Sequence, residues 1–166
     1  MISLSRIGFL KISQDEKMKV IHATTDHIPD LIGLMKLFYA ESNYTVNIEK
    51  AEEVFRRYIG SPSLGNVLIV VDDNKVVGYI IIKYVYTMSN YGYICSFEDL
   101  FVKQENRRKN AASALIERAI DIARSQGIRN YSLEVGADNI GAKKLYEKYG
   151  FKVRAKNIET MEKEEI

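Results

Sequence analysis

A short basic stretch is the part of the sequence best suited to bind an anion. Arg107, Arg108 and Lys109 directly precede the segment 110–125, whose apolar residues recur at helical spacing. A helix N-terminus offers unpaired backbone N–H groups and about half a positive charge, and the adjacent cations add to it. We therefore expect a phosphate-bearing ligand here, with a solvated basic loop as the alternative.

Two adjacent carboxylates, Glu98 and Asp99, lie in a strand-like run, 93–102, just before the basic stretch. Side chains alternate between the two faces of a strand, so only one carboxylate should face a cleft unless a bulge intervenes. The alternatives are that both are surface charges, or that they bind a cationic substrate without catalysis.

The remaining residues with reactive side chains favour structural roles. Cys95 is the only cysteine, lies in the same strand-like run and has no recognisable His partner, so we expect a buried structural thiol. His22 and His27 lack a third metal ligand at suitable spacing, and we expect no metal site. Neither GxxxxGK[ST] nor GxGxxG occurs, which argues against a nucleotide P-loop.

Length and charge narrow the class of protein. The chain has 166 residues, 24 Lys and Arg against 22 Asp and Glu, and a net charge of +2. This length fits one domain, and this charge is too small for an extended nucleic-acid surface. No apolar run approaches the roughly 20 residues of a membrane helix. We expect a cytoplasmic protein without nucleic-acid or membrane partners, with the domain at 18–166 and an extension or edge strand at 1–17.

The periodicity of apolar residues predicts one α/β (α+β) domain with a central mixed, mostly antiparallel sheet flanked by about four helices. Asp73-Asn74 is expected to form a hairpin turn, and Gly127 and Gly150 are expected to end helices. The expected strands are 19–23, 67–72, 75–86, 93–102, 129–135 and a last one from 151 to 153. The expected helices are 28–42, 48–59, 110–125 and 139–149.

Two motifs within 19–153 resemble those of the GNAT superfamily of acetyl-CoA-dependent N-acyltransferases. The signature Q/R-x-x-G-x-G/A corresponds to 107–112, although Asn110 stands where glycine is usual and Arg108 also replaces a common glycine. The second motif, N-x-x-A-x-x-L-Y-x-x-x-G-F, matches without a gap at Asn139, Ala142, Leu145, Tyr146, Gly150 and Phe151. Their order, with a strand between them, makes the resemblance specific.

The resemblance implies that acetyl-CoA is the cosubstrate and that no metal is used. Arg107 would help to shape the phosphate loop, and Asn139 would bond to the pantetheine arm, cap a helix, or do both. Ala142 would mainly pack. The implied cofactor-binding residues are Leu100, Phe101 and Val102 along the pantetheine arm; Arg107, Arg108, Lys109, Asn110, Ala111, Ala112 and Ser113 at the pyrophosphate; and Asn139 and Ala142.

The resemblance also implies the catalytic groups. An aliphatic amine with a pKa near 10 is mostly protonated at neutral pH, so a base or water relay is needed. Glu98 is placed like the base of polyamine-type family members, with Asp99 as the competing base, and both are candidates for binding the substrate. Tyr146 aligns with the tyrosine that protonates the departing thiolate, whereas helical periodicity alone favours a core-facing aromatic.

The predicted function is acetyl transfer to a primary amine of a small molecule, with a polyamine-like acceptor favoured, by direct attack in a ternary complex. A protein amine is an alternative acceptor. A non-catalytic acyl-CoA sensor is a different alternative, suggested by Asn110 and Arg108. We expect the acceptor pocket between the first two helices and the loop 87–92, and a homodimer that uses the apolar run 76–85 as a shared sheet edge.

Overall fold

The computed structural model describes residues 18–41 and 45–154. The predicted extension at 1–17 and the end of the predicted domain lie outside these residues. The strands are β1 (Met18–His22), β2 (Gly65–Asp72), β3 (Lys75–Thr87), β4 (Gly92–Val102) and β5 (Asn130–Leu133). The α-helices are α1 (Ile28–Glu41), α2 (Ile48–Gly60), α3 (Ala111–Ser125) and α4 (Ile140–Lys148). Among these helices, none combines the length and apolarity needed to cross a lipid bilayer.

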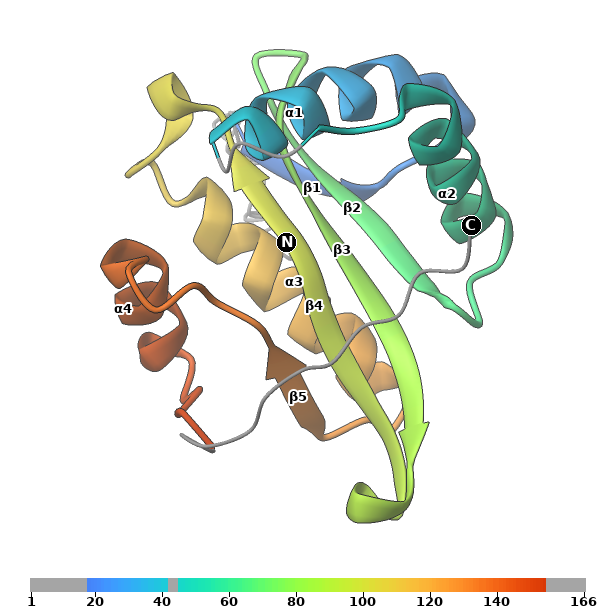
Figure 1. Ribbon diagram of the computed structural model, residues 1–166, viewed down its shortest axis with the longest axis vertical. Helices are drawn as coiled ribbons and strands as arrows, with labels where there is room; N and C mark the ends of the chain where they lie inside the picture. Colours follow the sequence, from blue (N-terminus) through green and yellow to red (C-terminus); the bar gives the residue numbers. More distant parts are fainter. Residues whose placement is uncertain (1–17, 42–44, 155–166) are drawn as a thin grey trace, which may run out of the picture.

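The strands form one sheet in the order β1-β2-β3-β4-β5 (Figure 1). The first three pairings are antiparallel, and β4 pairs with β5 in parallel after the crossover through α3. The predicted mixed, mostly antiparallel sheet with four helices is therefore confirmed. Asp73 and Asn74 both have positive φ, 47° and 61°, as the predicted tight hairpin turn requires.

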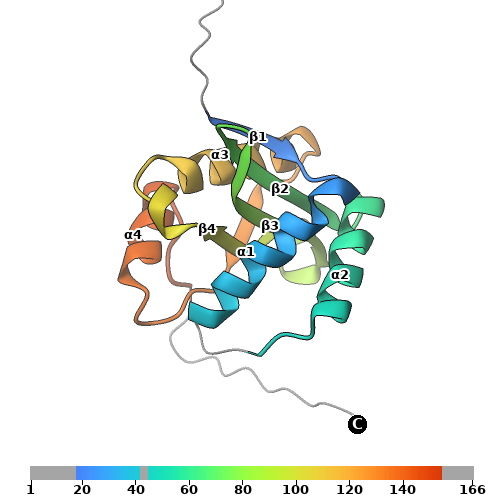
Figure 2. The same cartoon turned by 90° about the horizontal axis from the view of Figure 1, so that it is seen from above.

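Helices cover both faces of the sheet (Figure 2). On one face, α1 and α2 bury a cluster that includes Leu31, Phe55 and Tyr79. On the other face, α3 buries a second cluster, which includes Leu115 and Ile116, and α4 packs against its edge. Because strand side chains alternate between the faces, successive residues of β2 from Val67 to Val70 belong in turn to the two clusters.

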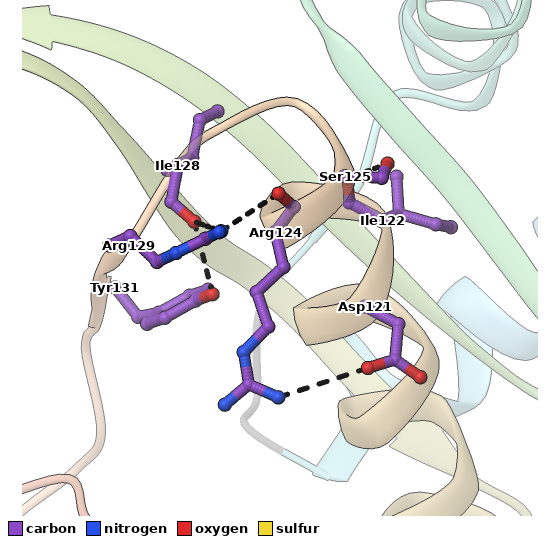
Figure 3. Close-up of polar contacts among 7 residues, drawn as sticks. All are labelled: Asp121, Ile122, Arg124, Ser125, Ile128, Arg129 and Tyr131. Atoms are coloured by element: carbon purple, nitrogen blue, oxygen red, sulfur yellow. Dashed lines mark hydrogen bonds and ion pairs between the residues drawn. The ribbon is translucent and has the colours of Figure 1, made fainter.

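The end of α3 is fixed by backbone hydrogen bonds around Gly127, which has a φ of 80°. The N–H of Gly127 donates to the carbonyl of Arg124 at 3.0 Å, and that of Ile128 donates to the carbonyl of Ala123 at 3.0 Å. This pair of bonds is a Schellman motif, which needs a left-handed residue at the glycine position. The Arg129 guanidinium also donates to the Arg124 carbonyl, at 2.8 Å (Figure 3). The chain is thereby turned into β5.

Two predictions about strands were wrong. No strand forms at 151–153, where the backbone N–H of Phe151 donates to the carbonyl of Tyr146 and ends α4. The run 76–85 is not a sheet edge, because β3 is paired with β2 on one side and with β4 on the other. This run is therefore unavailable for the expected dimer contact.

Candidate active site

A bulge in β4 interrupts its pairing with β3. Two residues of β4, Glu98 and Asp99, oppose the single residue Ile81 of β3. The pairs on either side are Ile80 with Leu100 and Ile82 with Phe97. An extra residue of this kind lets two consecutive side chains lie on the same face of a sheet.

The packing on either side of the bulge shows the change of face. Phe97 packs in the cluster beneath α3, and Phe101 packs in the cluster beneath α1 and α2. Residues four apart in a regular strand lie on the same face. Phe97 and Phe101 lie on opposite faces because the bulge between them reverses the alternation. Glu98 and Asp99 accordingly both line the pocket on the α1–α2 side, which is the exception to simple alternation that a bulge was expected to cause.

The pocket has a volume of about 390 Å³ and lies between α1, α2 and the sheet. Apolar and aromatic side chains dominate its lining, and Glu98 and Asp99 are its charged groups, a composition typical of ligand sites. The loop 87–92 does not line this pocket, contrary to expectation. The lining residues are Met35, Tyr39, Thr45, Val46, Asn47, Ala51, Val54, Phe55, Tyr58, Ile81, Glu98 and Asp99.

Two tyrosines hold the Asp99 carboxylate. The fully buried Tyr79 donates from its hydroxyl to Oδ2 at 3.1 Å, and Tyr39 on α1 lies 3.4 Å from both carboxylate oxygens. Burial raises the pKa of Asp99, the neighbouring Glu98 adds to the rise, and the two hydroxyl groups oppose it. Burial and Asp99 raise the pKa of Tyr39 to about 12 and also raise that of Tyr79, so both hydroxyl groups remain protonated donors at neutral pH.

Glu98 has different partners from Asp99. Its Oε1 atom lies 3.0 Å from the Nζ atom of Lys83 on β3, and the Ser96 hydroxyl donates to the same oxygen at 2.9 Å. Within the described part of the chain, its Oε2 atom has no hydrogen-bond partner. The two carboxylates therefore differ: Asp99 is enclosed by hydroxyl groups, and Glu98 is ion-paired at the mouth of the pocket.

Beside the bulge, β4 and β5 part. Pairing between them covers only Ile94 to Phe97 of β4 (Figure 1). Among the described strands, none pairs with residues 98–102 on that side, so the backbone of Leu100, Phe101 and Val102 borders an open edge. An extended ligand with amide groups can bond to an edge of this kind as an added strand would.

Arg107 fixes the loop that follows this open edge. Its Nε atom donates to the carbonyl of Val102 at 2.8 Å, and its Nη2 atom donates to Glu41 at the end of α1 at 2.6 Å. Its guanidinium carbon also lies 5.4 Å from the ring centroid of Phe101. Arg107 is thus committed to shaping the loop, whereas Arg108 and Lys109 are exposed.

The two residues that replace glycine in the first motif adopt backbone conformations typical of glycine. Arg108 has a φ of 62° and Asn110 a φ of 66°, both left-handed. Asparagine tolerates this region better than most residues, whereas arginine is strained there. Asn110 is the N-cap of α3, and the backbone N–H groups of the first turn, Ala111 to Ser113, begin the helix directly after it. The loop thus adopts the left-handed backbone conformations that glycine usually supplies, without containing glycine.

Several residues of the second motif cap the two ends of α4. The Asn139 side chain accepts from the backbone N–H of Ala142 at 3.0 Å, which caps the start of the helix. Gly150, with a φ of 84°, ends the helix, and the N–H of Phe151 donates to the carbonyl of Tyr146 at 3.2 Å. The rings of Tyr146 and Phe151 pack with centroids 5.8 Å apart, the apolar contact that often accompanies a Schellman motif.

These contacts link Tyr146 to β4 through Phe151. Its ring packs on Phe151, whose ring centroid is 5.6 Å from that of Phe97 on β4. The hydroxyl of Tyr149 donates to Glu117 at 2.9 Å and holds α4 against α3. Burial raises the pKa of Tyr146, so this half-buried hydroxyl is protonated at neutral pH. In the described residues it has no hydrogen-bond partner.

Cys95 and the two histidines lie apart from this chemistry. Cys95 is fully buried as predicted, and burial raises its pKa to about 12, which keeps it as a thiol. His27 accepts from the backbone N–H of Thr24 at 3.0 Å before α1. Over residues 18–41 and 45–154, no cluster of three or more His, Cys, Asp or Glu is arranged to hold a metal ion.

Comparisons with known proteins agree with this geometry. The sequence profile of the Acetyltransferase (GNAT) family matches residues 31–151. A 53-residue segment is 40% identical to human N-acetyltransferase 8, covering 32% of this chain and 23% of that protein. The chain thus matches about a quarter of the length of that curated relative.

Two solved structures share the fold. A possible acetyltransferase from Clostridium difficile 630 superposes with a TM-score of 0.77 at 19% identity, over 90% of this chain and 100% of that one. A predicted acetyltransferase from Clostridium acetobutylicum, solved with acetyl-CoA, gives 0.74 at 17% identity, over 87% and 96%.

Proposed function

Because the chain belongs to the acetyltransferase (GNAT) family, we propose that it uses acetyl-CoA to acetylate a primary amine of a small molecule. The observation that carries the proposal is the β4 bulge. It turns two carboxylates into one apolar pocket at the point where β4 and β5 part. An amine seated in the pocket would meet a ligand lying along the open edge of β4.

The chain's own groups fit acetyl-CoA. The open edge at Leu100, Phe101 and Val102 suits the amide groups of the pantetheine arm. The exposed Arg108 and Lys109, with the N–H groups at the start of α3, suit the pyrophosphate. When bound, acetyl-CoA supplies the thioester whose carbonyl carbon gains a bond to the amine nitrogen as its bond to sulfur breaks.

The carboxylates have separate tasks in this proposal. Asp99 is fixed by Tyr39 and Tyr79 and gives the amine a stationary counter-charge. Glu98 lies nearer to solvent and keeps Oε2 uncommitted within the described residues, so we assign it the proton that the ammonium must lose. It passes this proton to bulk water afterwards.

Tyr146 is assigned the opposite proton transfer. Burial keeps its hydroxyl protonated, and the residue packs against the apolar cluster beneath α3, on the face of the sheet opposite the pocket. In this proposal the Tyr146 hydroxyl delivers a proton to the departing sulfur and is reprotonated by the second proton that the nitrogen loses as the amide forms. The groups assigned to the attacking amine and to the departing sulfur then belong to opposite faces of the sheet, and both act in a single ternary complex.

The test is thiol release from acetyl-CoA over a panel of primary amines, with the acetylated product identified by mass. Aralkylamines, alkylamines and polyamines are all included, because the predicted polyamine preference stays a prediction. Acetylated amine from the wild-type protein is expected. Bound acetyl-CoA with no turnover on any amine or protein extract would instead favour the acyl-CoA sensor.

Matched variants test the assigned roles. Tyr146→Phe keeps the ring packing on Phe151 and is expected to lower kcat by roughly a hundredfold with acetyl-CoA affinity unchanged. Glu98→Gln removes the group that accepts the proton while keeping the shape of the side chain, and it is expected to lower kcat. The control, Tyr91→Phe, removes a hydroxyl from a highly exposed side chain outside the pocket lining and should leave kcat unchanged.

A further inference from the structure

The two carboxylates of the pocket are neutralised to different extents. Asp99 is surrounded by the hydroxyl groups of Tyr39 and Tyr79, and within the described residues it forms no ion pair. Glu98 is paired with Lys83, whose ammonium lies 3.0 Å from Oε1. When both carboxylates are ionised, their two negative charges and the one positive charge of Lys83 leave one uncompensated negative charge.

The charge of Lys83 acts on the pocket itself. Burial and the Glu98 carboxylate raise the pKa of Tyr58 on α2, and Lys83 opposes that rise. Tyr58 lines the pocket opposite the sheet, so the ammonium lies within electrostatic reach of a bound ligand. A neutral residue at position 83 would leave Glu98 available to a second cationic group of the substrate.

From this balance of charges we propose that Lys83 determines which amines the pocket accepts. It limits the acceptor to one cationic amine on an apolar body and disfavours diamines and polyamines. The inference rests on the proposed function and narrows its substrate class, against the polyamine preference that the sequence suggested. Asp99 receives the single ammonium, and the side chains of Val46, Val54 and Phe55 enclose the apolar body.

A second ammonium has no favourable place in such a pocket. Away from Glu98 and Asp99, the described lining offers apolar, hydroxyl and amide groups but no further carboxylate. A buried cation without a counter-charge is strongly disfavoured, and one placed at Glu98 must displace Lys83 or share its partner. Either route weakens the binding of a diamine relative to that of a monoamine of equal length.

The experiment compares pentylamine with cadaverine, which have the same carbon chain and differ by one terminal amine. For the wild-type protein, kcat/KM for pentylamine should exceed that for cadaverine by roughly two- to fivefold, about the value of one partly exposed ion pair. Lys83→Met, which keeps an unbranched side chain without charge, should remove or reverse this ratio. Lys83→Arg, which keeps the charge, should retain it.

The ratio of two substrates on one protein does not depend on the fraction that is folded. Equal use of both amines by the wild type, or a ratio unchanged in Lys83→Met, would overturn the inference while leaving amine acetylation intact. Acetylation of no amine in the full panel by protein that binds acetyl-CoA would overturn the proposed function, and the inference with it.

Discussion

Removal of one hydroxyl group, in Tyr79→Phe, is expected to destabilise the fold through the carboxylate that it supports. Tyr79 is fully buried, and its hydroxyl donates to Asp99 at 3.1 Å. The ring itself packs near Phe55, with centroids 6.1 Å apart, and is unchanged in the variant. A hydrogen bond to a charged group contributes about 1.5–3 kcal/mol, so a loss of ~2 kcal/mol in the free energy of unfolding is expected at neutral pH.

The loss should depend on pH in a definite direction. Burial raises the pKa of Asp99, and the Tyr79 hydroxyl opposes this rise by favouring the ionised carboxylate. Without the hydroxyl, the pKa of Asp99 in the folded protein rises further, so the folded variant holds its proton to higher pH. The difference in stability between wild type and variant therefore grows as pH rises through the pKa of Asp99, and it is smallest where both are protonated.

Urea unfolding at several pH values measures this difference. Tyr39→Phe is the matched control, because its hydroxyl lies farther from the carboxylate, at 3.4 Å, on a half-buried side chain, and its loss should be smaller. In an Asp99→Asn background, the effect of Tyr79→Phe should fall, since the charged partner is gone. An equal loss in both backgrounds, or a loss that shrinks with rising pH, would refute the reasoning.

Two further predictions concern the loops that border the site. Arg108→Gly should be neutral or stabilising by up to about 1 kcal/mol in urea unfolding, because relief of a left-handed arginine, about 1–2 kcal/mol, exceeds the entropy that glycine adds to the unfolded chain. Asn110→Gly should gain less, since asparagine already tolerates that conformation, and a less stable Arg108→Gly would contradict the prediction. Gly150→Ala should cost about 1 kcal/mol and lower kcat, because the turn at φ 84° holds Phe151 against Tyr146; an unchanged kcat would argue against that positioning.

The features that the sequence predicted well are local. The turn at Asp73-Asn74 and the helix end at Gly127 depend on the conformational preferences of single residues, which are legible in the sequence. The ends of α4 could be predicted equally well, because the capping asparagine and the terminal glycine are themselves part of the motif.

The features that the sequence left open or missed depend on contacts between distant residues. A bulge at Glu98 and Asp99 could be named only as a condition, because it contains no glycine and has no signature of its own, and only the register against Ile81 reveals it. The partners of the two carboxylates come from other elements: Tyr39 from α1, and Tyr79 and Lys83 from β3. A hydrophobic residue after Gly150 resembled the start of a strand, but Phe151 completes the helix cap instead.

Calorimetric titration of acetyl-CoA into the purified protein, with free CoA as the comparison, tests the central claim most directly. The account depends on a phosphate loop that adopts left-handed conformations at Arg108 and Asn110 without glycine. It predicts saturable binding with a micromolar Kd for both ligands. Absence of binding at millimolar acetyl-CoA by a folded protein would contradict the account, because the bulge and its carboxylates would then have no acyl donor to act on.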